Sequence, residues 1–190
     1  MKILHFALAG ALALAAFTGG ALAQSNDNYL TIELKDGPVV IELRPDIAPK
    51  HVQQIKELAA AGEYDNVAFH RVIQGFMAQT GDVQYGDMEE GFQPQLAGTG
   101  GSSKPDLPAE FSDVPFERGT VGMARSQDPD SANSQFFIMF APGDFLNGQY
   151  TIVGKVVEGM ENVDKIKMGD EASNGAVTDP DRMLSVKVGK

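Results

Sequence analysis

The sequence predicts a mainly β domain, most simply a closed eight-stranded antiparallel barrel capped by two α-helices. Short segments of alternating apolar and polar residues recur at about eight places along the chain, whereas only two segments show helical spacing. No internal repeat and no linker divides the chain. Closing the sheet removes exposed edge strands, and helices can cover the two open ends. A two-sheet sandwich fits the alternation as well.

The first segments predict a hairpin followed by a helix. Residues 29–34 and 39–43 alternate apolar and polar, and the Asp-Gly pair at 36–37 between them is a turn signal. Pro49 begins a stretch in which apolar residues recur at helical spacing, and Gly62 ends it.

A long loop is predicted in the middle of the chain. Two strands are expected at 67–73 and 76–79, and residues 82–115 are then rich in Gly, Pro, Ser and acidic residues, with a brief pairing expected at 109–112. A loop of this length in a compact domain is usually functional or folded on its own contacts. The later strands are expected at 119–124, 135–140, 151–157 and 184–188, and a second short helix at 161–167.

The N-terminal residues 1–23 are typical of a secretory signal peptide. A charged start precedes an apolar run at 6–17, and small residues follow at 21–23. The alternative is a membrane anchor, but a run of about 12 residues falls short of the ~20 that a spanning helix needs. We expect cleavage after Ala23, which leaves one domain at 24–190 in the periplasm, with no membrane association after cleavage.

Composition excludes several kinds of site. The formal net charge of −11 disfavours nucleic acid as a partner. The absence of Cys excludes disulfides, thiolate zinc sites and a Cys nucleophile. Beyond the signal peptide only His51 and His70 remain, too few for a three-His zinc site, and residues 128–133 depart from the calcium-loop pattern. We therefore expect no metal and no cofactor, and we expect His70 to be a hydrogen-bonded core or loop residue.

Residues 69–82, FHRVIQGFMAQTGD, place a cation among apolar residues. Arg71 lies in a predicted strand, where a charge must point outward or be paired. Further along, alternation places Phe136 and Phe137 on opposite faces of a strand. We expect Phe136 in the core, while its neighbour is able to face outward.

Together with other blocks, this segment resembles a known family. GTGG at 98–101, GTVGMAR at 119–125, NSQFFI at 133–138 and FLNGQYTIVGKVVEGM at 145–160 are similar to the cyclophilin-type peptidyl-prolyl cis-trans isomerases. The similarity covers about residues 29–188, with the blocks in the family's order. It implies a cyclophilin-like eight-stranded barrel with a helix at each end, a site on its outer face, and isomerisation of X-Pro bonds that assists the folding of exported proteins.

The resemblance also implies site residues. Arg71 matches the catalytic arginine. The proline-ring pocket is matched by Phe76, Met77, Phe137 and Leu146, and the polar contacts beside it by Gln79 and Gln135. The segment that pairs with substrate backbone is matched by Ala124 and Arg125, and the pocket wall by Phe145 and Tyr150.

Three of these positions depart from many family members. Arg125 stands where Asn is often found, Tyr150 where eukaryotic members have His, and Phe145 where they have Trp. Because Phe cannot donate the hydrogen bond that Trp gives to cyclosporin, weak affinity for that drug is expected. Residues 83–97 look like an insertion relative to compact members.

Isomerisation needs no nucleophile, which suits this set of residues. Amide resonance gives peptide-bond rotation a barrier of about 18–20 kcal/mol, and the enzyme must favour the twisted amide over the planar forms. Two alternatives remain: a non-catalytic chaperone or binding module for Pro-containing segments, and a lipocalin-like barrel with a hollow interior. The expected partners are Pro-containing segments of unfolded or folding proteins, bound by a monomer.

Overall fold

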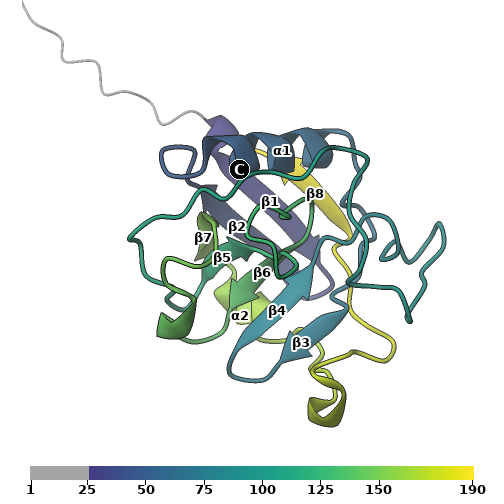
Figure 1. Cartoon of the computed structure of the whole chain (residues 1–190). Coiled ribbons are helices and arrows are strands. Elements are labelled where there is room, and N and C mark those ends of the chain that lie inside the picture. Colours follow the sequence, from purple (N-terminus) through teal and green to yellow (C-terminus); the bar gives the residue numbers. More distant parts are fainter. Residues whose placement is uncertain (1–25) are drawn as a thin grey trace, which may run out of the picture.

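The computed structural model describes residues 26–190, so the predicted signal peptide lies outside the described residues. Eight strands form one antiparallel sheet in the order β3-β4-β6-β5-β7-β2-β1-β8 (Figure 1). The strands are β1 (Tyr29–Leu34), β2 (Gly37–Leu43), β3 (Arg71–Ile73), β4 (Met77–Thr80), β5 (Thr120–Met123), β6 (Phe136–Met139), β7 (Ile152–Glu158) and β8 (Ser185–Val188). The helices are α1 (Pro49–Ala60) and α2 (Met160–Val163), with short 3-10 helices η1 (Asn26–Asn28), η2 (Asp144–Leu146) and η3 (Glu171–Ser173).

The sheet is curled, with β3 and β8 at its two edges. These edge strands form no ladder with each other in the described chain; residues 67–72 instead bond to the segment 175–183 that precedes β8. Val72 N, for example, donates to Gly175 O at 2.8 Å. Eight antiparallel strands and two helices are thus confirmed, while full closure stays a prediction. Because all eight strands belong to one sheet, the two-sheet sandwich is wrong.

The main core fills the inside of the curl. The apolar positions of β1 and β2 that were predicted from alternation are buried there, and the predicted hairpin is confirmed by their antiparallel pairing. The helix α1 lies across one end of the sheet and packs against β8 (Figure 1). Its Val52, Ile55 and Leu58 are buried, as their helical spacing predicts. Each such side chain contributes about 1.5–3 kcal/mol by leaving water.

A second apolar cluster lies on the outer face of the same sheet. Since side chains alternate along a strand, Phe136 of β6 joins the main core, whereas Phe137 joins the outer cluster. The predicted opposition of the two rings is confirmed, and both are buried. The other buried members of the outer cluster are Met77, Phe116, Met139, Leu146 and Ile152.

Two local predictions are wrong. The predicted helix at 161–167 is shorter, because Lys165 N and Ile166 N bond to carbonyls three residues back and the α-helical pattern ends at Val163. Residues 109–112 form no strand. The N–H of Glu110 donates to the Thr151 hydroxyl instead, at 2.9 Å, so it is not available for a ladder.

The buried carboxylate of Asp82 organises the long loop. Its oxygens accept the N–H groups of Gln84 and Tyr85 at one end of residues 83–97, and those of Gly98 and Gly100 at the other, all at 2.7–3.1 Å. The segment 83–97 contains no strand and is held by these bonds near the start of the loop. Backbone bonds to residues outside the segment, from Ala68 N to Gly86 O and from Met88 N to Asn66 O, also hold it, in addition to internal bonds such as that from Gln93 N to Tyr85 O.

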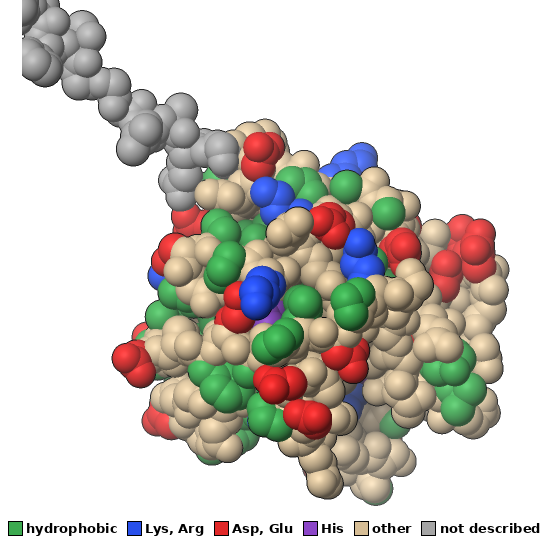
Figure 2. Space-filling view, turned by 45° about the horizontal axis from the view of Figure 1, so that its top comes forward, with side chains coloured by type: hydrophobic (Ala, Val, Ile, Leu, Met, Phe, Trp, Pro, Cys, Tyr) green, Lys and Arg blue, Asp and Glu red, His purple; other side chains and the backbone are tan. Residues whose placement is uncertain are grey.

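On the face shown in Figure 2, acidic, basic and hydrophobic side chains are interspersed. No helix within residues 26–190 is long and apolar enough to cross a membrane.

Candidate functional site

A row of paired residues crosses the outer face of the sheet. Arg71 of β3 is opposite Gln79 of β4, Gln79 is opposite Phe137 of β6, and Phe137 is opposite Gly122 of β5. Residues directly opposite each other in neighbouring strands project their side chains to the same face. The register therefore brings a cation, an amide and an aromatic ring together from three separate strands.

This row borders a pocket of about 420 Å³, called here the aromatic pocket. All the site residues predicted from the sequence line it, except Gln135. Gln149, which was not predicted, lines it as well. The lining residues are Arg71, Phe76, Met77, Gln79, Ala124, Arg125, Phe137, Phe145, Leu146, Gln149 and Tyr150.

Stacked rings form the floor of the aromatic pocket. Phe137 stacks on Phe116 with ring centroids 5.8 Å apart and meets the edge of Tyr150 at 5.9 Å. A side chain at Gly122 would place its Cβ 2.7 Å from both phenylalanine rings, so only glycine leaves room for this stack. Phe116 is fully buried and was missed by the sequence analysis, because it lies in the long loop and outside any alternating segment.

Two aromatic rings form the rim. Phe76 and Phe145 lie with their centroids 5.5 Å apart, tilted by 42°. Phe145 is 66% exposed, whereas Phe137 in the floor is 5% exposed. The rim therefore presents apolar surface to solvent, and a ligand that enters the pocket would cover it.

The Arg71 guanidinium is held by uncharged groups. Its Nε donates to Asn174 O at 3.0 Å, its Nη2 to Asn174 Oδ1 at 3.0 Å, and its Nη1 to Gln79 Oε1 at 3.2 Å. No carboxylate pairs with it among residues 26–190. Burial lowers the pKa of Arg71 below its usual range, but arginine remains charged in proteins. The site thus holds an oriented, un-neutralised positive charge.

A chain of amides extends from Arg71 across the site. Gln79 Nε2 donates to Gln135 Oε1 at 3.0 Å, and Gln135 Nε2 donates to Gly100 O at 2.8 Å. Each link fixes which way the next amide faces, so Gln79 presents its oxygen to Arg71. Gln135 therefore lies behind Gln79, which explains why it does not line the aromatic pocket.

Asn174 was missed by the sequence analysis. It ends η3 with a φ of 54°, and Gly175 follows with a φ of 82°. A Cβ on Gly175 would lie 2.5 Å from Ile73 of β3, so glycine lets this turn approach the edge strand closely. The Asn-Gly pair at 174–175 is a turn signal in the sequence, but nothing local shows that the turn contacts Arg71.

A second pocket of about 770 Å³ adjoins the first and is called here the glycine-lined pocket. It shares Gln79, Ala124 and Arg125 with the aromatic pocket. Its other lining residues are Gly98, Thr99, Gly100, Gly101, Ser102, Lys104, Asp106, Ser126, Ser131, Asn133 and Gln135.

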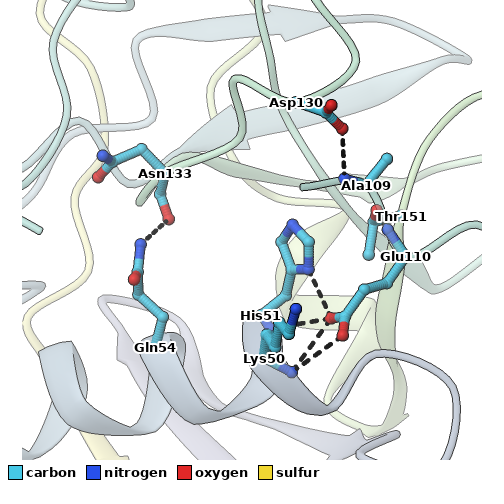
Figure 3. A network of polar contacts seen from close by, with 8 residues as sticks. All are labelled: Lys50, His51, Gln54, Ala109, Glu110, Asp130, Asn133 and Thr151. Atoms are coloured by element: carbon cyan, nitrogen blue, oxygen red, sulfur yellow. Dashed lines mark hydrogen bonds and ion pairs between the residues drawn. The ribbon is translucent and has the colours of Figure 1, made fainter. Parts of the chain in front are cut away.

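The loops around the glycine-lined pocket are tied to the fold by polar contacts (Figure 3). Gln54 of α1 donates to Asn133 O at 3.1 Å, and Asp130 accepts the N–H of Ala109 at 2.8 Å. The loop at 104–110 is thereby joined to the loop at 126–133. These bonds therefore join two loops that contribute residues to the lining of the pocket.

Glu110 anchors the same loop at the start of α1 (Figure 3). Its carboxylate accepts the backbone N–H groups of Lys50 and His51 and lies 2.7 Å from His51 Nδ1. Partial burial of Glu110 opposes its ionisation, but the hydrogen bonds from His51 and Lys50 outweigh this and lower its pKa. A carboxylate at a helix N-terminus also interacts favourably with the helix dipole.

His70 is buried, but its predicted hydrogen bonding is wrong. Neither ring nitrogen makes a hydrogen bond with good geometry to the described residues. Burial lowers the pKa of His70 to about 4, although Asp82 and the Ala68 backbone act in the opposite direction. Residues 26–190 also contain no group of three or more His, Cys, Asp or Glu side chains that could hold a metal ion.

Comparison with known sequences identifies a matching family. The family described as "Cyclophilin type peptidyl-prolyl cis-trans isomerase/CLD" matches residues 29–188. A Brucella suis protein named "Probable peptidyl-prolyl cis-trans isomerase" is 61% identical over 191 residues, which is 99% of this chain and 97% of that protein. Peptidyl-prolyl cis-trans isomerase B of Escherichia coli is 37% identical over 147 residues, covering 73% of this chain and 83% of that protein.

Solved structures agree with this match. A Cryptosporidium parvum cyclophilin-type peptidyl-prolyl cis-trans isomerase, crystallised in the presence of the dipeptide Ala-Pro, superposes with a TM-score of 0.71 at 28% identity. The superposition covers 85% of this chain and 99% of that one. The cyclophilin AquaCyp293 from Hirschia baltica gives a TM-score of 0.70 at 27% identity, covering 86% of this chain and 74% of that one.

Proposed function

The chain belongs to the cyclophilin-type peptidyl-prolyl cis-trans isomerase family, and on this premise we propose that it accelerates rotation about X-Pro bonds in Pro-containing protein segments. The observation that carries the proposal is the relation of Arg71 to the aromatic pocket. An oriented guanidinium without a carboxylate partner in the described chain borders a pocket with a rigid ring floor. That pocket suits a proline ring, and the guanidinium suits the amide nitrogen attached to it.

Arg71 is the proposed catalytic residue. In the planar X-Pro amide the nitrogen lone pair is delocalised into the carbonyl, whereas in the twisted amide the nitrogen regains it. A guanidinium N–H beside the ring can then donate a hydrogen bond that the planar nitrogen cannot accept. Because this bond forms only in the transition state, it lowers the barrier without tightening the binding of either planar form.

The aromatic pocket is proposed to hold the proline ring while the preceding carbonyl turns. Met77, Phe137 and Leu146 are buried in the outer cluster and give the pocket apolar walls of fixed shape. Excluding water from these walls strengthens the interaction between the guanidinium and the nitrogen. Ala124 and Arg125, which directly follow β5, are proposed to contact the substrate backbone.

A binding module without turnover is the second candidate. The exposed aromatic rim alone would support binding of Pro-containing segments. The guanidinium held by Asn174 and Gln79 favours catalysis, since binding of a proline ring does not need a charge at that point. A lipocalin-like carrier is disfavoured, because apolar side chains fill the inside of the curl.

The test is the cis-to-trans isomerisation of an Ala-Pro-Phe reporter peptide by residues 24–190. We expect acceleration over the spontaneous rate by the wild type, and its loss in Arg71→Ala. Binding of the peptide without acceleration would favour the binding module and overturn the proposed activity.

Export is proposed on the pattern of residues 1–23 alone. We propose cleavage after Ala23, a periplasmic monomer, and clients among folding exported proteins. Mass spectrometry of the protein from the periplasmic fraction should find Gln24 as the first residue, whereas an intact N-terminus would contradict cleavage.

We also propose that the hydrogen bonds between 67–72 and 175–183 close the curled sheet into a barrel.

A further inference from the structure

Two arginines of the described chain have no carboxylate partner, and both line the aromatic pocket. They are Arg71 and Arg125. The whole chain carries a formal net charge of −11, so acidic partners for arginine are plentiful elsewhere on it. Every other arginine pairs with a carboxylate: Arg44 with Asp46, Arg118 with Asp164 and Arg182 with Glu89.

Arg125 is held in place by neutral groups. Its guanidinium lies over the Tyr150 ring, 4.4 Å from the centroid. Nε and Nη2 donate to Gln149 O at 3.3 and 2.9 Å, and Nη1 donates to Ser126 O at 2.8 Å. The carbonyls and the ring orient the group without neutralising it, and at least one Nη2 N–H remains available. An anion that binds there therefore meets a cation whose side-chain freedom is already restricted.

The position of Arg125 is at the border between the two pockets. It lines both of them, so a peptide that leaves the aromatic pocket toward the glycine-lined pocket must pass it. Two other charged side chains line the glycine-lined pocket; Lys104 has a carboxylate partner, whereas the partner of Asp106 is a neutral amide. Lys104 pairs with Glu57 at 2.8 Å, and Asp106 accepts a hydrogen bond from Asn133 at 2.8 Å.

We propose that Arg125 is a specificity-determining residue that selects Pro-containing segments with an Asp or Glu side chain either two residues before the proline or directly after it, on the flank that runs toward the glycine-lined pocket. This inference rests on the proposed function, since the aromatic pocket must hold the proline. A residue spans about 3.3–3.6 Å, so the acidic residue lies within about two positions of the proline. An ion pair at a partly exposed site gives a preference of about two- to five-fold.

The test uses peptides that differ only in one charge. Two pairs of acetylated and amidated peptides carry Glu or Gln, one pair two residues before proline and the other directly after it. For each peptide, kcat/KM is measured by NMR exchange spectroscopy and Kd by titration at low salt. The proteins are the wild type, Arg125→Gln, Arg125→Lys, and Lys165→Gln, a charge-matched control at a residue that lines neither pocket.

We expect the wild type to favour Glu over Gln in one of the two pairs by about two- to five-fold. The ratio of the value for the Glu peptide to that for the Gln peptide should fall to about one in Arg125→Gln and should persist in Arg125→Lys and Lys165→Gln. In high salt this ratio should become smaller, because ion pairs at exposed sites are screened. Equal values for Glu and Gln in both pairs, or a preference that survives in Arg125→Gln, would overturn the proposal.

The design separates this proposal from the proposed activity. If the wild type accelerated none of the peptides, the isomerase activity would fail, and the Kd ratios would still decide the role of Arg125. A purely structural role for Arg125 would lower the binding of Glu and Gln peptides alike and leave their ratio unchanged.

Discussion

The Nη2 atom of Arg71 lies 3.0 Å from the Oδ1 atom of Asn174, although 103 residues separate the two in the chain. The backbone carbonyl of Asn174 also accepts from Arg71 Nε at 3.0 Å. The direction in which the guanidinium points is therefore set by a turn that belongs to another part of the sequence. This makes Asn174 a positioning residue for the proposed reaction.

Asn174→Gly tests that role. Glycine removes the side-chain oxygen but adopts the φ of 54° easily, so the turn should be preserved. A hydrogen bond to a charged group contributes about 1.5–3 kcal/mol, so we expect kcat to fall by about ten- to one hundred-fold. Peptide Kd should change little, and the free energy of unfolding should fall by no more than about 1.5–3 kcal/mol, because the same hydrogen bond is lost from the folded state. A variant with normal kcat would show that Gln79 and the carbonyl suffice to orient Arg71.

Phe145→Trp should raise the affinity for cyclosporin. Phe145 lies on the rim, 66% exposed, where an indole has room and can donate the hydrogen bond that Phe cannot. The chain contains no Trp, so the introduced indole is also a fluorescent probe of binding. We expect Kd to fall about ten-fold, the value of one additional hydrogen bond. Isothermal calorimetry on both proteins provides the control, and an unchanged Kd would contradict this account of the rim.

The pH dependence of stability should depend on His70. Burial lowers its pKa from 6.5 to about 4, so between these values the unfolded chain binds a proton that the folded chain does not. The free energy of unfolding therefore falls as the pH drops through this window, by about 2 kcal/mol from His70 between pH 7 and pH 5.

His70→Gln removes the titrating group, so its stability should change less between pH 7 and pH 5 than that of the wild type. Urea denaturation at several pH values measures the difference. Parallel curves for the two proteins would show that His70 does not titrate differently on folding.

Glu110→Gln should destabilise the fold at neutral pH. The carboxylate accepts two backbone N–H groups at the start of α1 and pairs with His51, so we expect a loss of about 1–2 kcal/mol. Since folding lowers the pKa of Glu110, its contribution is present above the unfolded value near 4.5 and disappears as the pH falls through the lower folded value.

Glu57→Gln is the matched control for this measurement. Glu57 lies on the same helix and pairs with Lys104, but this ion pair is exposed to solvent, so its removal should lower the free energy of unfolding less than removal of the Glu110 contacts. Equal losses in the free energy of unfolding in Glu110→Gln and Glu57→Gln would mean that Glu110 does not anchor the helix.

Local patterns predicted the parts of the fold that depend on neighbouring residues. The hairpin of β1 and β2, the bounds of α1 and the opposite facing of Phe136 and Phe137 all follow from periodicity. The candidate site came from the family resemblance, and the register of β3, β4 and β6 explains how those residues meet.

What the sequence did not predict depends on contacts between distant segments. Phe116 and Asn174 lie in loops without periodicity, and only the tertiary fold brings them to Phe137 and Arg71. The early end of α2 reflects hydrogen bonds that tighten after Val163, which helical spacing does not reveal. His70 was expected to find a hydrogen-bond partner, but the fold buries it without one among the described residues.

The most direct test of the central claim separates binding from turnover in Arg71→Ala. Peptide Kd is measured by titration and kcat by NMR exchange at saturation. Arg71→Lys is the variant that keeps the positive charge but loses the planar guanidinium group. Since Arg71 is proposed to act on the twisted amide, we predict that kcat falls about one hundred-fold or more in Arg71→Ala while Kd changes by less than about three-fold. A Kd that weakens one hundred-fold with kcat unchanged would contradict the claim and make Arg71 a binding residue.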